Sequence, residues 1–377
     1  MFNKHNLGKN GCMLKGKLRH KGYDWWWHSF TGRDVVTGEE KAFFIEFFLC
    51  NPELAEEHAV FGQSFASQRF HKKPSYVMVK AGCWGEDHAQ LHRFFPWKKV
   101  LMHGNAPFSI TAGDCRLSEK ATSGHICVSK EEAAFHPEWM SDAGEMEWNL
   151  SIDKKIAFNV GYGTSPFLRK IEAFEMYWHA EGMKTEYSGT VKWNGHEYLV
   201  TPSTCYGYAD KNWGRNFTSP WLWLSSCNLV SKKTGQKLAN SVFDIGGGRP
   251  RVFFVPLGRK LLGGFYYEGK EYEFNFSKFW TGSKTKFECE ETEDEIRWKV
   301  VQTTNTAMLK TQVRCKKKDM LLINYESPDG KKLHNRLWNG GTGTGRLKLY
   351  EKRNDVWELV DDMLAYNVGC EFGEYTK

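Results

Sequence analysis

The chain consists mainly of short segments that alternate polar with apolar residues, or run apolar, and then stop at glycine, asparagine or aspartate. Alternation at every second position places one face of a β-strand against a core, whereas a helix needs a repeat near 3.6 residues. Clear examples are 41–49, 146–152, 188–193 and 346–351. Asn194-Gly195 and Asp329-Gly330 carry the dipeptides that favour tight hairpins. The pattern predicts an all-β protein of antiparallel strands arranged as barrels or sandwiches.

Three segments carry patterns that are typical of structures other than strands. The segment 52–59 predicts one short helix, with Asn51 as its N-cap. The glycine runs 246–248 and 340–345 look like phosphate-binding loops, but the first lacks a Gly-Lys-Ser/Thr ending. The second leads into the strand expected at Arg346 and not into a helix. We therefore expect both glycine runs to be hairpin turns.

A weak internal repeat indicates two similar units. An acid, then tryptophans, then an aromatic strand ending in Cys-Asn occurs at 24–51 and again at 210–228. The repeat predicts two β-barrel domains that pack tightly, because no Pro/Ser-rich linker separates them. We place the N-terminal domain at 1–198 and the C-terminal domain at 199–377.

Charge and segment composition limit the partners and the location. The net charge is +7, from 52 basic and 45 acidic residues, and the basic residues are scattered. No nucleic-acid-binding motif accompanies this charge, so we expect no nucleic-acid partner and at most peripheral contact with anionic membranes. The N-terminus lacks the apolar core of a signal peptide, and no apolar run approaches the ~20 residues that span a bilayer.

Ten cysteines without a C-x-x-C pair suit free thiols in a reducing compartment, which favours a cytoplasmic protein. The oligomeric state stays open.

Aromatic residues are abundant, with 16 Trp and 26 Phe. They favour either a cavity for a hydrophobic small molecule or simply a β-rich core with large side chains. Both interpretations remain open from composition alone.

Two segments combine acids with aromatic residues. On an extended strand, Asp24 shares a face with Trp26, and Asp210 shares a face with Asn212. An acid buried among aromatic side chains has its pKa raised and can remain protonated near neutrality, which suits acid catalysis on an apolar substrate. The alternative is structural: both aspartates cap turns or pair with nearby lysine or arginine.

Motifs for metal-dependent or nucleophilic chemistry are absent from the sequence. It contains no H-E-x-x-H and no G-x-S-x-G, and His88 and His92 are a single pair four residues apart. We expect no metal and no cofactor.

The segment 206–228 resembles the second signature of the tocopherol cyclase family, in which Tyr-x-Glu/Asp-Lys-Asn-Trp-Gly precedes a tryptophan-rich strand ending in Cys-Asn. The segment 23–27 is similar to the Glu-Gly-Trp-Tyr of the cyclases and to the Glu-Trp-Trp-Tyr of related carotenoid hydratases and lipocalin-like pericyclases. The segment 345–353 matches the family's Gly-x-Leu-x-Leu-x-x-x-Arg strand. Trp25, Trp27 and Tyr177 depart from the cyclase pattern at positions near the expected pocket, which leaves the substrate open.

The resemblance implies two lipocalin-like barrels and a cofactor-free reaction that closes a chromanol ring from a prenylated hydroquinone. In that reaction an acid protonates an alkene, and a phenol oxygen captures the tertiary cation. By residue match, Asp210 is the expected acid, Asp24 is the rival, and Tyr206 or Tyr208 orients the phenol. The expected substrate-binding side chains are Trp26, Trp27, Tyr177, Trp178, Tyr208, Asn212, Trp213, Trp221 and Trp223.

Two other functions remain compatible with the sequence. One is a hydratase or pericyclase that acts on an isoprenoid or polyketide chain. The other is a non-catalytic carrier or sensor of a hydrophobic molecule, because a fold of this kind binds ligands with or without transforming them.

Overall fold

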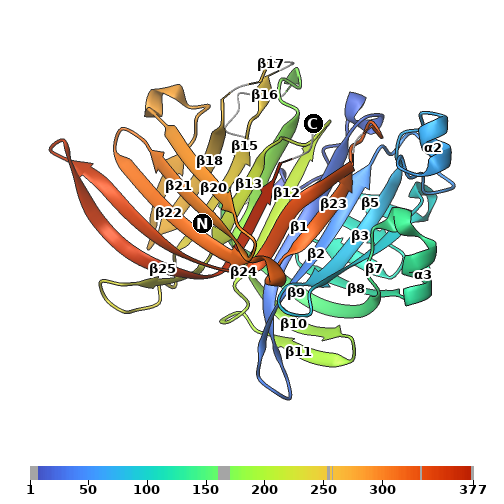
Figure 1. Ribbon diagram of the computed structural model, residues 1–377, viewed down its shortest axis with the longest axis horizontal. Helices are drawn as coiled ribbons and strands as arrows, with labels where there is room; N and C mark the ends of the chain where they lie inside the picture. Colours follow the sequence, from blue (N-terminus) through green and yellow to red (C-terminus); the bar gives the residue numbers. More distant parts are fainter. Residues whose placement is uncertain (1–6, 160–169, 253–254, 257, 332, 375–377) are drawn as a thin grey trace. The chain divides into compact units, whose positions relative to one another are not determined.

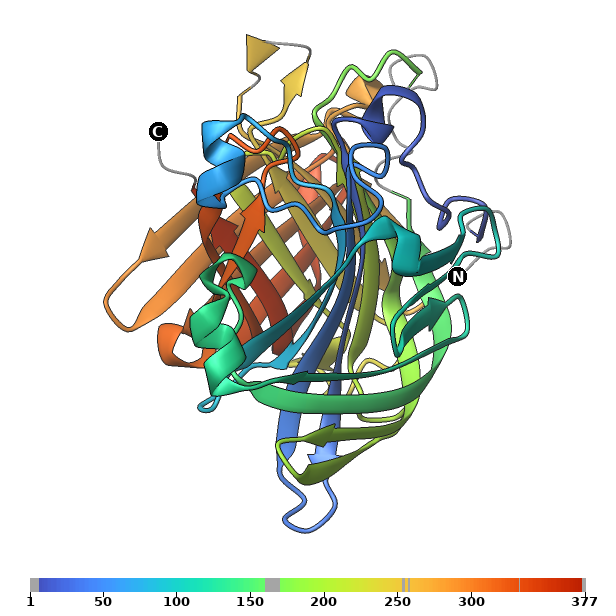
Figure 2. The ribbon, with the colours of Figure 1, turned by 90° about the vertical axis from the view of Figure 1, so that its right-hand side faces the viewer.

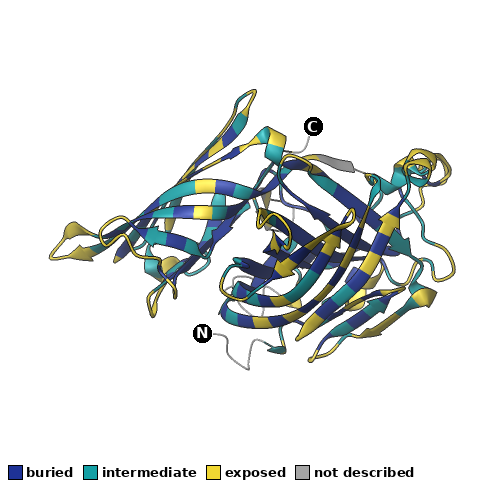
Figure 3. Ribbon diagram, turned by 90° about the horizontal axis from the view of Figure 1, so that it is seen from below, coloured by how far each residue is buried: buried dark blue, intermediate teal, exposed yellow. Residues whose placement is uncertain are grey.

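The computed structural model describes residues 7–159, 170–252, 255–256, 258–331 and 333–374 (Figure 1). Strands account for 60% of the protein, which confirms the predicted all-β fold class. Figure 3 shows strands banded in alternating buried and exposed residues, as expected for sheets with one face against a core. Within the described ranges, the α-helices are short, at Phe65–Arg69 (α2) and Lys130–Phe135 (α3).

The first sheet has twelve antiparallel strands and curves into a barrel (Figure 2). Its order is β4-β3-β2-β1-β11-β10-β9-β8-β7-β6-β5, and β12 pairs with both β1 and β10. The strands are β1 (Tyr23–Asp34), β2 (Glu40–Cys50), β3 (Tyr76–Cys83), β4 (Ala89–Phe95), β5 (Val100–His103), β6 (Ser109–Ala112), β7 (Cys115–Ser118), β8 (Ala121–Val128), β9 (Gly144–Phe158), β10 (Met176–Trp193), β11 (His196–Val200) and β12 (Gly207–Gly214).

The turn between β10 and β11 follows the sequence prediction. Asn194 and Gly195 both have positive φ, 47° and 86°, which a tight hairpin turn of this class requires. Trp193 pairs with His196 across the turn, so the dipeptide sets the register of the hairpin.

The second sheet has eleven strands, and its main path is β19-β18-β15-β13-β25-β24-β22-β21-β20. Its core packs aliphatic and aromatic side chains from strands across the sheet, including Leu222, Phe243 and Trp298. The strands of this path are β13 (Trp221–Ser226), β15 (Val242–Gly248), β18 (Lys260–Tyr267), β19 (Lys270–Phe274), β20 (Lys284–Glu291), β21 (Glu295–Thr303), β22 (Ala307–Lys316), β24 (Leu333–Arg353) and β25 (Val356–Gly373). The short strands β14 (Asn228–Ser231) and β23 (Leu321–Glu326) complete this sheet, and β16 (Arg251–Val252) pairs with β17 (Val255–Pro256) in a separate two-stranded sheet.

The chain forms two compact units. One contains 1–157, 176–217 and 323–335, and the other contains 158–175, 218–322 and 336–377. The expected boundary at residues 198 and 199 differs from this partition, because β12 supplies the backbone partners of β1 and β10 and therefore belongs to the first unit. A division into independently folding domains at that boundary stays a prediction.

Two local predictions were wrong. Residues 52–59 form turns and no helix; Asn51 has φ 45° and its side chain accepts a hydrogen bond from the Gly22 N–H, so it closes a turn. The glycine runs lie inside β15 and β24 and are not hairpin turns. In β24, a Cβ at Gly345 would lie 2.6 Å from the carbonyl oxygen of Gln312, so close packing of neighbouring strands explains that glycine.

Two further observations concern membrane-spanning helices and the state of the cysteines. In the part of the chain that the structure describes, no helix is long and apolar enough to cross a membrane. All ten cysteines are free thiols, and most are buried.

Candidate active site

The pairing of β1 with β12 brings the two predicted acid segments side by side. Asp24 lies opposite Trp213, and Trp27 lies opposite Asp210. Since directly opposed residues share a face, Asp24 and Asp210 point to opposite faces of the sheet. The two candidate acids therefore belong to two different environments.

Asp24 points to the inner face of the first sheet and forms an ion pair with Lys211, and both side chains are fully buried. The Met13 N–H donates a hydrogen bond of 2.6 Å to the other carboxylate oxygen. Burial raises the pKa of Asp24, and the Lys211 ammonium partly offsets that rise. Asp24 is thus a carboxylate held by a cation and a backbone donor.

Indole rings surround the Lys211 ammonium. Its Nζ lies 3.9 Å from the ring centroid of Trp26 and 5.5 Å from that of Trp213. Trp26 also stacks on Phe108 at 3.9 Å, and Trp213 stacks on Tyr177 at 5.5 Å. The predicted residues Trp26, Tyr177 and Trp213 therefore form one aromatic wall, with faces that stabilise positive charge.

Asp210 occupies the other face, between neutral donors. Trp178 Nε1 donates to its Oδ2 at 2.7 Å, and the Tyr208 hydroxyl donates to the same oxygen at 3.1 Å. Asn212 shares this face and accepts a 2.7 Å hydrogen bond from the Tyr23 hydroxyl. Trp27 also lies on this face and stacks on Phe44 at 5.1 Å.

The remaining predicted residues, Tyr206, Trp221 and Trp223, lie outside β1 and β12. Tyr206 precedes β12, is half-buried and has φ 42°. Trp221 and Trp223 belong to β13 of the second unit, where their indole N–H groups donate to Glu371 and Asp244.

A buried polar cluster that the sequence analysis missed lies on the same inner face as Asp24. Lys154 of β9 is central to it, because its Nζ lies 2.9 Å from Glu119 Oε2 and 2.8 Å from Glu181 Oε1. Glu181 Oε1 is also 4.0 Å from His28 Nε2, and His28 Nδ1 lies 2.8 Å from the Tyr187 hydroxyl. The side chains of Glu119, Glu181 and Lys154 are at most 6% exposed.

Asn10 connects this cluster to the aromatic wall. Its side-chain amide donates to Glu119 Oε2 at 3.0 Å, its Oδ1 lies 3.2 Å from His179 Nε2, and its backbone carbonyl accepts from Trp26 Nε1 at 2.9 Å. His179 in turn pairs with Lys211 across β10 and β12. The polar contacts thus continue from Glu181 to the neighbourhood of Asp24.

The acids on this inner face outnumber the lysines by one. Three carboxyl groups, of Asp24, Glu119 and Glu181, share it with two ammonium groups, of Lys154 and Lys211. Burial, with the nearby Lys154, lowers the pKa of His28 well below its usual value, so His28 adds no charge. Two positive and three negative groups would leave one uncompensated buried charge, which is costly. Burial accordingly raises the pKa of Glu181 from 4.5 to about 7, against the opposing effect of Lys154.

The chain offers one signal that could have located this cluster. Lys154 lies at an apolar position of the alternating pattern in β9, where Trp148, Leu150 and Ile152 are buried. A lysine in such a register requires a buried acid as partner. Among the described residues, no three His, Cys, Asp or Glu side chains are grouped to hold a metal ion.

One solved structure supports the fold, and a family model matches the sequence. A putative AttH from Nitrosomonas europaea aligns with a TM-score of 0.50 at 12% identity, covering 98% of this chain and 96% of that one, and the likeness at this identity concerns the fold alone. Kievitone hydratase from Nectria haematococca aligns with a TM-score of 0.49 at 11% identity, over 98% of this chain and 95% of that one. No curated protein matches the sequence. The family model described as tocopherol cyclase-like matches residues 63–374, which is most of the chain, and the protein therefore belongs to the tocopherol cyclase-like family.

Proposed function

We propose that the protein is a cofactor-independent enzyme that protonates an alkene of an isoprenoid substrate and closes a chromanol ring on a prenylated hydroquinone. The observation that carries this proposal is the buried carboxyl group of Glu181: burial raises its pKa to about 7, and the neighbouring Glu119 adds to that rise. A general acid works best when its pKa lies near the working pH.

The proposed steps balance without an external reagent. Glu181 gives its proton to the less substituted alkene carbon, and the tertiary carbon becomes a cation. The phenol oxygen of the hydroquinone bonds to that cation and releases its proton, which returns to the Glu181 carboxylate. The product is an isomer of the substrate, and Glu181 ends each turnover protonated.

The aromatic rings around Lys211 are the candidates for stabilising a positive intermediate. The Trp26 and Trp213 faces accept positive charge, as their positions around the Lys211 ammonium indicate. In this proposal the Asp24–Lys211 pair is the electrostatic partner of the acid and not the proton donor, because the Asp24 carboxylate is held in an ion pair. Asp210 lies on the opposite face of β12 from Lys211, and the role of acid that the sequence suggested for it stays a prediction.

The test uses purified protein and a reduced methyl-phytyl hydroquinone, with mass-resolved chromatography of the products. We expect an isomeric chromanol from the native protein and at least about a 100-fold lower rate from Glu181→Gln. Glu147→Gln is the matched control, since Glu147 is 57% exposed on the neighbouring strand β9 and should leave the rate unchanged. Circular dichroism and a melting temperature for each variant separate lost chemistry from lost folding.

Other results of this test would indicate a different acid or a different function. Loss of activity in Asp210→Asn with full activity in Glu181→Gln would move the acid to Asp210. A product heavier by one water would identify a hydratase, in which water replaces the phenol as the nucleophile. Co-purified lipid with no turnover of any prenylated hydroquinone would indicate a carrier.

A further inference from the structure

The second unit carries exposed aromatic residues at one end of its sheet. Phe279 and Trp280 are 85% and 66% exposed, in a short 3-10 turn (η5, Phe279–Thr281) just before β20. At the tip of the β24–β25 hairpin, Val356 is 63% and Trp357 is 37% exposed. Single exposed apolar residues are ordinary, but adjacent large aromatic residues at these exposures are not.

These two apolar tips lie at the same end of the sheet. The turn between β21 and β22 connects them, because the Asn305 N–H donates to the Thr281 carbonyl at 3.0 Å and the Lys352 N–H donates to the Thr306 carbonyl at 2.9 Å. The turn is thus bonded to η5 on one side and to the end of β24 on the other. Figure 1 shows the tips of the β21–β22 and β24–β25 hairpins at one end of this sheet.

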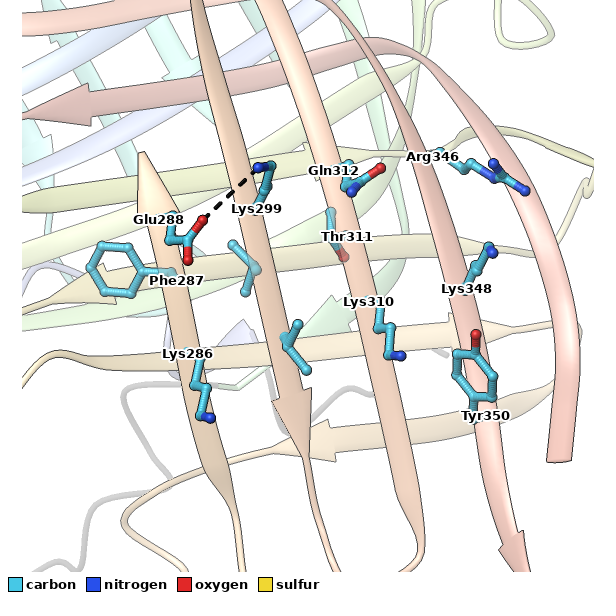
Figure 4. A pocket seen from close by; sticks show the side chains of 12 residues that line it. Lys286, Phe287, Glu288, Lys299, Lys310, Thr311, Gln312, Arg346, Lys348 and Tyr350 are labelled. Atoms are coloured by element: carbon cyan, nitrogen blue, oxygen red, sulfur yellow. Dashed lines mark ion pairs between the residues drawn. The ribbon is translucent and has the colours of Figure 1, made fainter. Parts of the chain in front are cut away.

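A basic row begins beside this end of the sheet. Register places Lys286 of β20, Lys310 of β22 and Lys348 of β24 in one line across the strands, through Val301 of β21. These side chains line a hollow of about 420 Å³ and are labelled in Figure 4. Along β20 and β21, the row lies two residue pairs from Lys284–Thr303, the pair of these strands nearest the β21–β22 turn.

Lys286 and Lys310 have no acid opposite them, whereas Lys348 lies directly opposite Asp362 of β25. Among the described residues, no carboxylate oxygen lies within 4.0 Å of the Lys286, Lys310 or Lys348 ammonium groups, whereas the neighbouring Arg346 is paired with Asp362. Lys310 lies directly opposite Lys348, an arrangement of like charges that destabilises a sheet. An anionic surface placed against the row would offset that repulsion.

We propose that this end of the second unit docks on an anionic phospholipid bilayer. Phe279 and Trp280 insert at the level of the headgroups, where tryptophan is favoured, and Lys286, Lys310 and Lys348 attract the lipid phosphates and carboxylates. A soluble polyanion would use the lysines but would give no reason for the exposed aromatic pair. The proposal does not depend on the reaction assigned to the first unit.

Vesicle flotation with the full-length protein tests the surface. The vesicles contain phosphatidylcholine, either alone or with about one-third phosphatidylserine, at low ionic strength. We expect the native protein to float with the anionic vesicles and to bind the neutral ones at least about tenfold more weakly. Added salt should weaken the anionic contribution, because screening shortens the range of the lysine charges.

Two variants with matched controls assign the residues. The triple variant K286Q/K310Q/K348Q should bind anionic vesicles about 100-fold more weakly, since each lysine near such a surface contributes roughly fivefold. F279S/W280S should bind at least about tenfold more weakly, through loss of apolar insertion. The controls are K72Q/K99Q/K120Q and F65S/F135S, which remove the same charge and comparable exposed aromatic area from the first unit and should bind normally.

Other results would overturn the proposal. Failure of the native protein to float with anionic vesicles would do so, as would equal losses in the control and test variants. Lysine-dependent binding of polyphosphate without vesicle binding would assign the basic row to a soluble polyanion instead of a membrane.

Discussion

Lys211 forms its ion pair with Asp24, which precedes it by 187 residues, and points away from Asp210, its immediate neighbour in the chain. The alternation of a β-strand explains the second part of this relationship, and the pairing of β1 with β12 explains the first. The Asp-Lys-Asn motif therefore distributes its acid and its base to opposite faces of the sheet. Any account of the family motif in this protein has to treat Asp210 and Lys211 as parts of different clusters.

Removing Asp24 should be costly for folding. Asp24→Asn leaves the Lys211 ammonium buried without its counter-ion, and we expect a loss of about 3–5 kcal/mol in the free energy of unfolding. Urea denaturation measures this loss. The double variant D24N/K211M, which removes both charges, should recover most of it, and a single variant as stable as the native protein would contradict the ion pair.

The contribution of Glu181 to stability should fall as the pH rises from about 5 to about 7. The pKa of Glu181 is raised from 4.5 to about 7 in the folded protein, so in this range the unfolded chain loses the proton that the folded protein keeps. The unfolded state therefore gains relative stability with increasing pH, by about 3 kcal/mol in total, and the effect levels off above pH 7. Urea unfolding at several pH values measures the slope.

The Glu181→Gln variant isolates this contribution. It cannot titrate, and it leaves two acids and two lysines in the cluster, so it should fold and should lack the Glu181 part of the slope. An unchanged slope in the variant would show that another group is responsible.

Lys154 should be far more important for stability than its neighbour Lys155. Lys154→Met leaves Glu119 and Glu181 together without a cation, and we expect a loss of more than about 3 kcal/mol at pH 7. Acidification should restore part of that loss, because both carboxyls can then be protonated. Lys155→Met is the matched control: Lys155 is 39% exposed, so its loss should cost less than about 1 kcal/mol. Similar losses in the two variants, measured by urea unfolding, would argue against the buried cluster.

The turnover rate should depend on a single acid with a pKa near 7. If Glu181 donates the proton, kcat falls as the pH rises through about 7, because the ionised carboxylate cannot protonate an alkene. A pH profile of kcat with the hydroquinone substrate measures this. A rate that is flat from pH 6 to pH 8 would exclude Glu181 as the rate-determining donor.

Local patterns predicted the strands well, whereas the long-range contacts required the structure. Period-two alternation placed Asp24 with Trp26 and Asp210 with Asn212, and the Asn194-Gly195 turn lies where its dipeptide indicated. The Lys154 cluster was missed, because its partners Glu119 and Glu181 come from other strands, and periodicity carries no information about which strands meet. The glycine run 340–345 was misinterpreted for a related reason: close approach of a neighbouring strand explains Gly345, and a turn does not.

The position of β12 between β1 and β10 also determines when the first sheet can be completed during synthesis. Residues 23–29 of β1 gain this partner only after residue 214 has left the ribosome, so this edge of β1 waits through nearly half of translation. An open strand rich in tryptophan is a template for pairing with other chains. A nascent or truncated chain that ends before β12 should therefore need a chaperone to stay free of aggregates.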